Sequence, residues 1–294
     1  MKKPIFTGSG VAIITPFTND TVDYPALRRL IDFQLAGGTD AVIVCGTTGE
    51  AATMSYVERM RTIETVVQQV DGRVPVIAGT GSNNTENAIT LSKDAALAGV
   101  DGILVVTPFY NKATQRGLVR HYTAIADAVD KPMILYNVPS RTGVKCAAET
   151  YAALSRHPNI HGVKEASGDF ALIQKTRELC PEDFYIWSGN DDETAPIMLF
   201  GGKGVISVAA NVAPRAVHDL AEACLKGDFV SAGSMQLKLR KLCEALFWEV
   251  NPIPVKTALS MMGCCQDILR LPLCEMEEGS RQRLREVLAE YGLV

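Results

Sequence analysis

Residues 102–106 read Gly102-Ile103-Leu104-Val105-Val106, a short run in which no polar residue alternates with the apolar ones. Such runs are typical of strands that are buried on both faces, as in a parallel sheet covered by helices. Toward both ends of the chain the same type of run recurs, and each run precedes a segment with helical spacing. The runs are residues 11–15, 41–44, 75–78, 102–106, 133–136, 160–164, 184–187 and 204–208.

The segments between these runs carry apolar residues three and four positions apart, which is the spacing of one helix face. Leu27, Leu30 and Ile31 begin one such stripe, which stops at the glycine pair 37–38. Strand–helix units in succession predict an α/β fold, a (β/α)8 TIM barrel. The alternative is an open doubly wound sheet, which typically carries a G-x-G-x-x-G turn after its first strand, and the chain has no such turn.

The part of the chain after the eighth unit shows only helical patterns, for example at Leu239, Leu242 and Leu246. We therefore expect residues 1–225 to form the (β/α)8 barrel catalytic domain and residues 226–294 to form a C-terminal helical extension. No low-complexity linker separates the two parts, so the extension is expected to pack on the barrel.

Composition argues against several kinds of partner. The 294 residues carry a formal net charge of −4, and no basic block or arginine-rich arm points to nucleic acid. No apolar run is long enough to predict a membrane span. The eight cysteines and four histidines lack the spacing of a metal site, so no metal is expected. We interpret the cysteines as reduced thiols of a cytoplasmic protein.

Polar residues are concentrated after the apolar runs, at the end of the strands where the active site of a TIM barrel lies. Lys164 ends the sixth run, so its stem should lie among apolar neighbours at the mouth of the barrel. Burial disfavours the charged form of a lysine and makes its amine a better nucleophile. The alternative is a structural ion pair with Glu165 or another carboxylate, and Lys164 alone does not decide between the two.

Three other strand ends carry candidate site residues. Tyr136 ends the fifth run, next to Lys164 in a barrel, where a tyrosine can move protons or can cap the core. Thr47 and Thr48 lie in a glycine-rich turn whose N–H groups can hold a carboxylate. Arg141 can clamp a second carboxylate, although a solvated loop arginine would look the same.

Two further segments are expected to be structural. Residues 189–191, Gly-Asn-Asp, are adequately explained as an acidic helix start. Residues 251–256, Asn-Pro-Ile-Pro-Val-Lys, lie outside the barrel and are predicted to form a rigid turn rather than part of a site.

Six ordered segments together resemble the dihydrodipicolinate synthase and N-acetylneuraminate lyase family, and the resemblance covers essentially the whole chain. They are residues 46–50 (GTTGE), 79–81 (GTG), 107–111 (TPFYN), 136–139 (YNVP), 162–166 (GVKEA) and 251–256 (NPIPVK). Residues 140–143 (SRTG) are similar to the synthase branch, whereas sialic-acid lyases typically lack the arginine.

The resemblance to the synthase branch implies an activity. A member of that branch would condense pyruvate with L-aspartate-4-semialdehyde, without a metal or an organic cofactor. This would be the first committed step of the diaminopimelate route to lysine.

The resemblance also implies four catalytic residues. Lys164 would form the Schiff base with pyruvate, and Tyr136 would donate and accept protons over the imine. Thr47 would link Tyr136 to Tyr110, which would come from a neighbouring subunit. The assembly would then be at least a dimer, and the family commonly forms a homotetramer, a dimer of dimers.

Four residues would hold the substrates. Thr48 would bind the pyruvate carboxylate through its hydroxyl and backbone N–H, and Gly189 and the backbone of Ile206 would line the pyruvate pocket. Arg141 would receive the carboxylate of L-aspartate-4-semialdehyde.

Two alternatives stay open. Another pyruvate-dependent aldolase or lyase, of the N-acetylneuraminate or keto-deoxy-sugar-acid type, would keep the Schiff base but not need Arg141. A non-catalytic protein that binds keto acids would not need the proton relay.

The chain departs from the family pattern in one region. Lysine-inhibited members usually carry polar residues and histidines shortly after the Gly-Glu pair, where this chain has Ala51, Ala52 and Met54. Phe109 replaces a tyrosine, and Asn87 stands where an acidic residue is common. We therefore predict weak or absent feedback inhibition by lysine.

Overall fold

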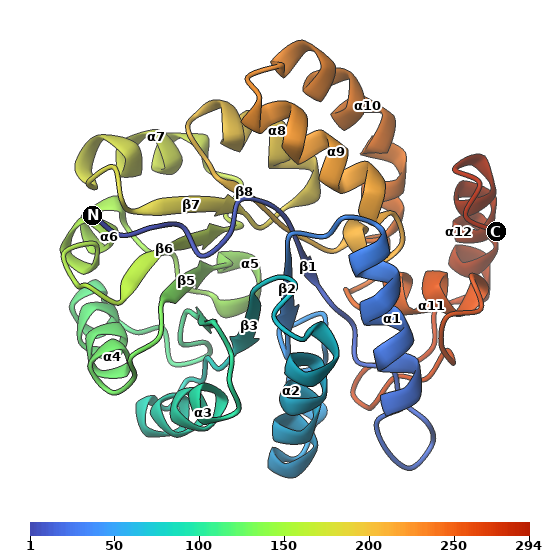
Figure 1. Ribbon diagram of the computed structural model, residues 1–294, viewed down its shortest axis with the longest axis horizontal. Helices are drawn as coiled ribbons and strands as arrows, with labels where there is room; N and C mark the ends of the chain where they lie inside the picture. Colours follow the sequence, from blue (N-terminus) through green and yellow to red (C-terminus); the bar gives the residue numbers. More distant parts are fainter.

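The computed structural model describes residues 1–294 and is a closed barrel of parallel strands ringed by helices (Figure 1). Each strand pairs with the next one in sequence, and β8 closes the barrel on β1. The predicted (β/α)8 TIM barrel is therefore confirmed. The strands are β1 (Gly8–Ala12), β2 (Ala41–Val44), β3 (Val76–Gly79), β4 (Gly102–Val106), β5 (Met133–Asn137), β6 (Ile160–Glu165), β7 (Tyr185–Ser188) and β8 (Gly204–Ser207).

Helices connect the strands and cover the outside of the barrel. Local capping explains several of their starts: Asp23 and Asn84 accept backbone N–H bonds at the starts of α1 and α3, and Ser55 and Glu58 form a capping box on α2. The barrel helices are α1 (Tyr24–Ala36), α2 (Tyr56–Val70), α3 (Thr85–Leu97), α4 (Gln115–Asp127), α5 (Pro139–Thr142), α6 (Ala148–Leu154), α7 (Phe170–Leu179), α8 (Thr194–Leu199) and α9 (Pro214–Leu225).

The first strand lies earlier in the chain than its apolar run predicts, at Gly8–Ala12 instead of residues 11–15. Gly8 pairs with Gly204 of β8, and a Cβ built on Gly204 would lie 2.0 Å from the carbonyl oxygen of Gly8. The two backbones approach closely because neither residue has a side chain there. Hydrophobicity gives no signal for a strand that begins with glycine and serine.

The interior of the barrel is a separate, smaller apolar cluster from the one under the helices. Tyr136, Lys164 and Trp187 are register partners on β5, β6 and β7, so their side chains point to the same face of the sheet. Trp187 is fully buried and stacks on Phe6, with ring centroids 5.4 Å apart. Lys164 is therefore the charged member of a row that otherwise fills the barrel with aromatic rings.

The C-terminal extension consists of α10 (Phe229–Ala245), α11 (Ile253–Met261) and α12 (Glu278–Glu290). In Figure 1, α10 lies along α9 on the outside of the barrel, and α11 and α12 lie together beyond α1. Leu242, Val255 and Leu259 belong to the same apolar core as the helices of the barrel. This shared core favours one folding unit, and the division after residue 225 stays a prediction.

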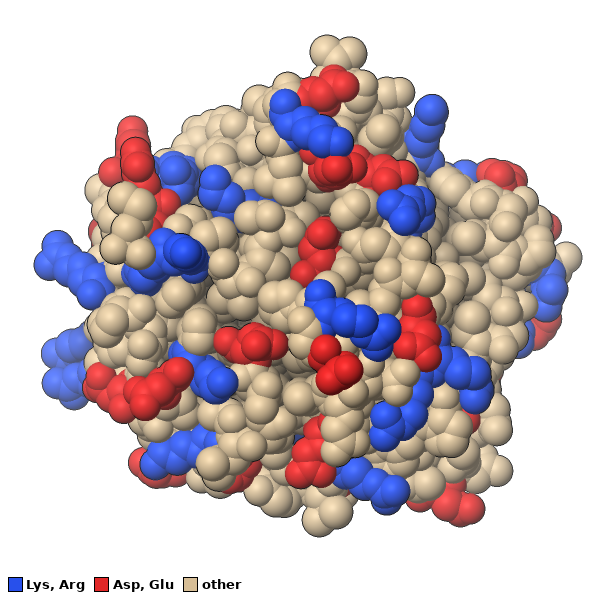
Figure 2. All heavy atoms as spheres, in the orientation of Figure 1, with Lys and Arg blue, Asp and Glu red and all other residues tan.

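The visible surface is evenly charged. Figure 2 shows Lys and Arg interspersed with Asp and Glu over this face, without a broad patch of either sign. None of the helices has the length and apolar character needed to cross a membrane.

Candidate active site

Lys164 lies against the ring of Tyr136 at the mouth of the barrel. Its Nζ atom is 4.4 Å from the ring centroid, and the residue is only 5% exposed. Burial lowers the pKa of Lys164 to about 8, although the negative charge of Asp191 opposes this shift. A substantial fraction of the amine is then neutral near physiological pH, which is the state that a nucleophile requires.

The ion pair between Lys164 and Glu165, which the sequence left open, does not form. Adjacent residues of a strand point to opposite faces, so Glu165 faces the helices and not the barrel interior. Its carboxylate accepts hydrogen bonds from Asn137 Nδ2 (2.9 Å) and from the hydroxyl of Tyr151 (2.9 Å). Lys164 is thus left without this partner.

Asp191 is the acidic group that acts on Lys164, and the sequence interpretation of residues 189–191 missed it. Asp191 does begin a helix, the short 3₁₀ helix η2 (Asp191–Glu193), but its carboxylate is buried, with only 6% of the residue exposed. The hydroxyl of Ser207 and the backbone N–H groups of Val208 and Ala209 donate to it, the latter two at 2.9 Å. No local signal in the sequence distinguishes it from a helix cap, because its donors come from the end of β8.

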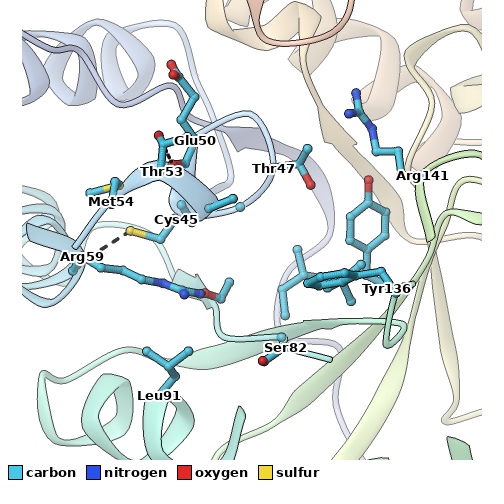
Figure 3. Close-up of a pocket in the computed structure, with 18 of the residues that line it drawn as sticks. Cys45, Thr47, Glu50, Thr53, Met54, Arg59, Ser82, Leu91, Tyr136 and Arg141 are labelled. Atoms are coloured by element: carbon cyan, nitrogen blue, oxygen red, sulfur yellow. Dashed lines mark hydrogen bonds between the residues drawn. The ribbon is translucent and has the colours of Figure 1, made fainter. Parts of the chain in front are cut away.

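Tyr136, Thr47 and Arg141 lie around the same pocket. Figure 3 shows the hydroxyl of Tyr136 pointing toward Arg141, with Thr47 on the facing wall. Burial raises the pKa of Tyr136, while the positive charge of Arg141 and the hydroxyl of Thr47 oppose this rise. The phenol is thus a protonated acid that is placed next to groups able to stabilise its anion.

Thr48 is buried, and it contacts Asn251, a residue of the extension that lines this pocket. The side-chain N–H of Asn251 donates to Thr48 Oγ1 at 3.0 Å, and Arg141 donates to the carbonyl oxygen of Asn251 at 3.3 Å. The expectation that residues 251–256 are only a rigid turn was therefore wrong, since Asn251 lines the pocket. Asn251 is 203 positions from Thr48 in the sequence, so the sequence gives no indication that the two residues are in contact.

Gly189 and Ile206 lie close to Lys164 from two other strands. A Cβ built on Gly189 would lie 3.1 Å from Lys164 Cε and 2.6 Å from Ala166 Cβ, so the lysine passes where a larger side chain would stand. Ile206 on β8 is fully buried in the interior cluster that also contains Tyr136. Both residues are therefore placed where they could form the wall of a small pocket beside the amine of Lys164.

Tyr110 is the one predicted catalytic residue that the single chain does not bring to the site. It is 86% exposed and adopts a left-handed backbone conformation (φ 73°) in the loop after β4. Phe109, next to it, is also partly exposed and lines the pocket.

The pocket has a volume of about 720 Å³ and is open at one side. One end is lined by Thr47, Tyr136 and Arg141. Met54 lies on the opposite side of the pocket in Figure 3, and Asn87 also belongs to its lining. The cavity has the size of an ordinary ligand pocket, which commonly measures 300–1,000 Å³, and so has room for two small organic acids.

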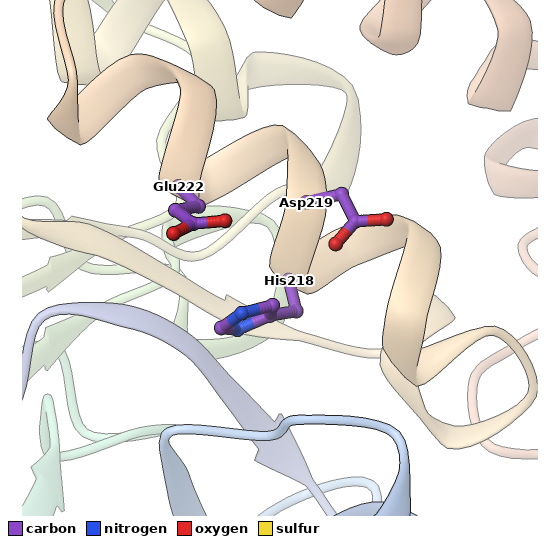
Figure 4. Close-up of side chains that lie close together, drawn as sticks. All are labelled: His218, Asp219 and Glu222. Atoms are coloured by element: carbon purple, nitrogen blue, oxygen red, sulfur yellow. The ribbon is translucent and has the colours of Figure 1, made fainter.

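A cluster of possible metal ligands lies elsewhere, on the outer face of α9. His218, Asp219 and Glu222 are close together there (Figure 4). Each already has a charged partner: His218 contacts Asp40 (3.0 Å), Asp219 contacts Arg215 (3.7 Å) and Glu222 contacts Lys226 (2.8 Å). Ordinary surface ion pairs account for this cluster.

Comparison with known proteins agrees with the geometry. The model of the dihydrodipicolinate synthetase family matches residues 5–291. The 4-hydroxy-tetrahydrodipicolinate synthase of Geobacter sulfurreducens is 54% identical over 99% of this chain and 100% of its own.

Solved structures of this family share the fold over nearly the whole chain. Dihydrodipicolinate synthase from Aquifex aeolicus superposes with a TM-score of 0.96 at 48% identity, covering 98% of this chain and 99% of its own. The chloride-inhibited enzyme from Acinetobacter baumannii, complexed with pyruvate, has a TM-score of 0.96 at 42% identity and covers 98% of this chain and 99% of its own.

Proposed function

The chain belongs to the dihydrodipicolinate synthetase family, and we propose that it condenses pyruvate with L-aspartate-4-semialdehyde through an imine on Lys164. The product is 4-hydroxy-tetrahydrodipicolinate, at the entry to diaminopimelate and lysine biosynthesis. The observation that carries the proposal is the buried amine of Lys164, 4.4 Å from the ring centroid of Tyr136 and with its pKa lowered to about 8.

The first half of the reaction makes the imine. The neutral amine of Lys164 attacks the ketone carbon of pyruvate, and loss of water leaves a protonated imine. Tyr136 donates the proton that the departing hydroxyl needs, and Thr47 and Tyr110 return a proton to it. The buried negative charge of Asp191 stabilises the cation that forms, since the attraction is little screened by solvent.

The second half makes the carbon–carbon bond and the ring. The imine acidifies the methyl group of pyruvate, which loses a proton to the Tyr136 relay. The resulting enamine adds to the aldehyde carbon, and the relay returns a proton to the oxygen of the former aldehyde. The amino group of the semialdehyde then attacks the imine carbon, the bond to Nζ breaks, and the proton lost by the attacking nitrogen returns to Lys164.

Two sets of donors hold the substrates. Thr48 binds the pyruvate carboxylate, and Gly189 and the backbone of Ile206 shape the space around it. Arg141 binds the carboxylate of the semialdehyde in a bidentate geometry, which is the arrangement that a guanidinium favours. Arg141 is also what favours this aldehyde over the sugar-acid substrates of related lyases.

Trapping the imine tests the proposal. Incubation with pyruvate and borohydride should add the mass of a reduced pyruvate adduct to the peptide that contains Lys164, and Lys164→Ala should not be labelled. Arg141→Ala should still be labelled, although more slowly at neutral pH because Arg141 helps to lower the pKa of Lys164. It should lose about 100-fold in kcat/KM for the semialdehyde, as expected when a charged hydrogen-bonded pair is removed. An unlabelled wild-type protein would sink the proposal, and turnover with other aldehydes alone would move the chain to another branch.

We also propose that the protein works in the cytoplasm as a homotetramer, a dimer of dimers, in which each Tyr110 completes a neighbouring site. The exposure of Tyr110 and Phe109 on one loop supports such an interface. The free state of all eight cysteines supports a reducing compartment. Mixed assemblies of Tyr110→Phe and Lys164→Ala subunits test the shared site: activity should reappear on mixing, and its absence in a verified hetero-oligomer would contradict the proposal.

A further inference from the structure

Helix α11 and the segment that precedes it contact the turn that carries Thr47 and Thr48 at two points. Asn251 directly precedes Pro252, the residue that caps α11, and its side-chain N–H donates to Thr48 Oγ1 at 3.0 Å. Further along α11, Lys256 forms an ion pair with Glu50, and both of these side chains are completely buried. The helix and the turn therefore hold each other in a fixed relation.

The direction of the Asn251–Thr48 hydrogen bond has a chemical consequence. The amide nitrogen of Asn251 can only donate, so Thr48 Oγ1 must be the acceptor. A threonine hydroxyl has one proton, and this proton is not used by Asn251. It stays available to an anion in the pocket.

Asn251 is poorly satisfied for a buried residue. It is 5% exposed, and its Oδ1 atom has no hydrogen-bond partner. An unpaired buried acceptor destabilises the folded state, so stability alone does not explain an asparagine at this position. The backbone carbonyl oxygen of Asn251, unlike Oδ1, accepts a hydrogen bond from Arg141 (3.3 Å), which ties the residue to the second carboxylate-binding side chain.

From these contacts we infer that Asn251 is a positioning residue, which keeps the hydroxyl of Thr48 oriented as a donor toward the carboxylate of pyruvate. The inference rests on the proposed function, in which Thr48 binds that carboxylate. Asn251 acts through Thr48 and does not itself touch the reacting atoms. The extension is thereby part of the active site and not only a cover on the barrel.

A double-mutant cycle with Asn251→Leu and Thr48→Val tests this inference. Leucine has a similar size, cannot donate, and removes the unpaired oxygen, so the protein should unfold at the same or a higher temperature. The pyruvate concentration that half-saturates borohydride trapping should nevertheless rise about tenfold, the range of a lost hydrogen bond. Asn251 is inferred to act through the hydroxyl of Thr48. In the Thr48→Val protein, which lacks this hydroxyl, Asn251→Leu should therefore change the half-saturating pyruvate concentration by less than about twofold.

The controls separate the possible failures. Thr257→Val on the same helix removes a partly buried hydrogen bond to Asp267 (3.0 Å) and should lower the unfolding temperature without changing pyruvate saturation. If Asn251→Leu does not fold, Asn251→Ala completes the same cycle. An equal effect in both backgrounds, or none in either, overturns the role of Asn251, whereas an untrapped wild-type protein refutes the proposed function itself.

Discussion

Asp191 sets the charge balance around Lys164. Three groups face the amine: the carboxylate of Asp191, the guanidinium of Arg141 and the ring of Tyr136. Burial and Arg141 lower the pKa of Lys164, and Asp191 raises it. The amine is therefore reactive but its cationic imine still has a counter-ion, which is a compromise between nucleophilicity and stabilisation of the intermediate.

Asp191→Asn removes only the group that raises this pKa. The protonated form of Lys164 becomes less favourable, so its pKa should fall below about 8. The neutral amine then persists to lower pH. The acid limb of the pH profile for pyruvate trapping should therefore shift to lower pH by up to about one pH unit, which is a modest electrostatic effect. An unchanged profile, or one displaced to higher pH, would contradict the role of Asp191; thermal unfolding of the variant serves as the control for lost backbone contacts.

The contact between α11 and the turn after β2 is held by a buried ion pair. Lys256 and Glu50 have no exposed side-chain surface, and Lys256 also lies 4.2 Å from the ring centroid of Phe17. The carbonyl oxygen of Ile268 accepts a hydrogen bond from the same ammonium at 3.0 Å. Loss of one partner would leave the other charge buried and uncompensated.

Lys256→Met should therefore cost about 3–5 kcal/mol in the free energy of unfolding, measured by denaturant titration. Adding Glu50→Gln should recover part of this loss, because the uncompensated charge is gone. Lys226→Met is the matched control: its ion pair with Glu222 lies on the surface, where solvent screens the charges, and its loss should leave the free energy of unfolding nearly unchanged. Equal losses for the buried and the exposed pair would show that the contact contributes no special stability.

At the scale of the whole molecule, the pocket extends from the barrel mouth to the region where the chain departs from lysine-inhibited relatives. Arg59 and Asn87 line this end, and neither offers a carboxylate to an ammonium group. Arg59 instead places a positive charge there, with its guanidinium donating to the carbonyl oxygen of Gly79 at 2.5 Å. The ammonium groups of a diamino acid would meet a positive charge there, and the one carboxylate that lines the pocket, that of Glu50, is already paired with Lys256.

We therefore expect that lysine at millimolar concentration leaves the rate unchanged in a coupled assay with both substrates. A matched variant, Asn87→Glu, restores an acidic side chain at this end and is expected to increase any response to lysine. Strong inhibition of the wild-type protein would show that the missing carboxylate is not needed.

The arrangement of the barrel was predictable because its cause is local. Apolar runs without alternation can only be buried on both faces, and parallel strands that follow each other in a barrel become neighbours. Consecutive strand ends must then meet, so Tyr136 and Lys164 were predictable as a pair. The start of β1 at Gly8 was not predictable, because a glycine that allows two backbones to approach closely adds nothing to an apolar pattern.

The sequence by itself determined which residues stand at the catalytic end of the barrel, since strand order alone brings them there. The tertiary structure decided what surrounds Lys164. Glu165 turns away because of strand alternation, whereas Asp191 is buried by donors from β8. Asn251 reaches Thr48 across 203 positions of the chain, and no spacing rule predicts a contact of that range. Charge balance and hydrogen-bond direction depend on such distant partners, and these exist only once the helices have packed.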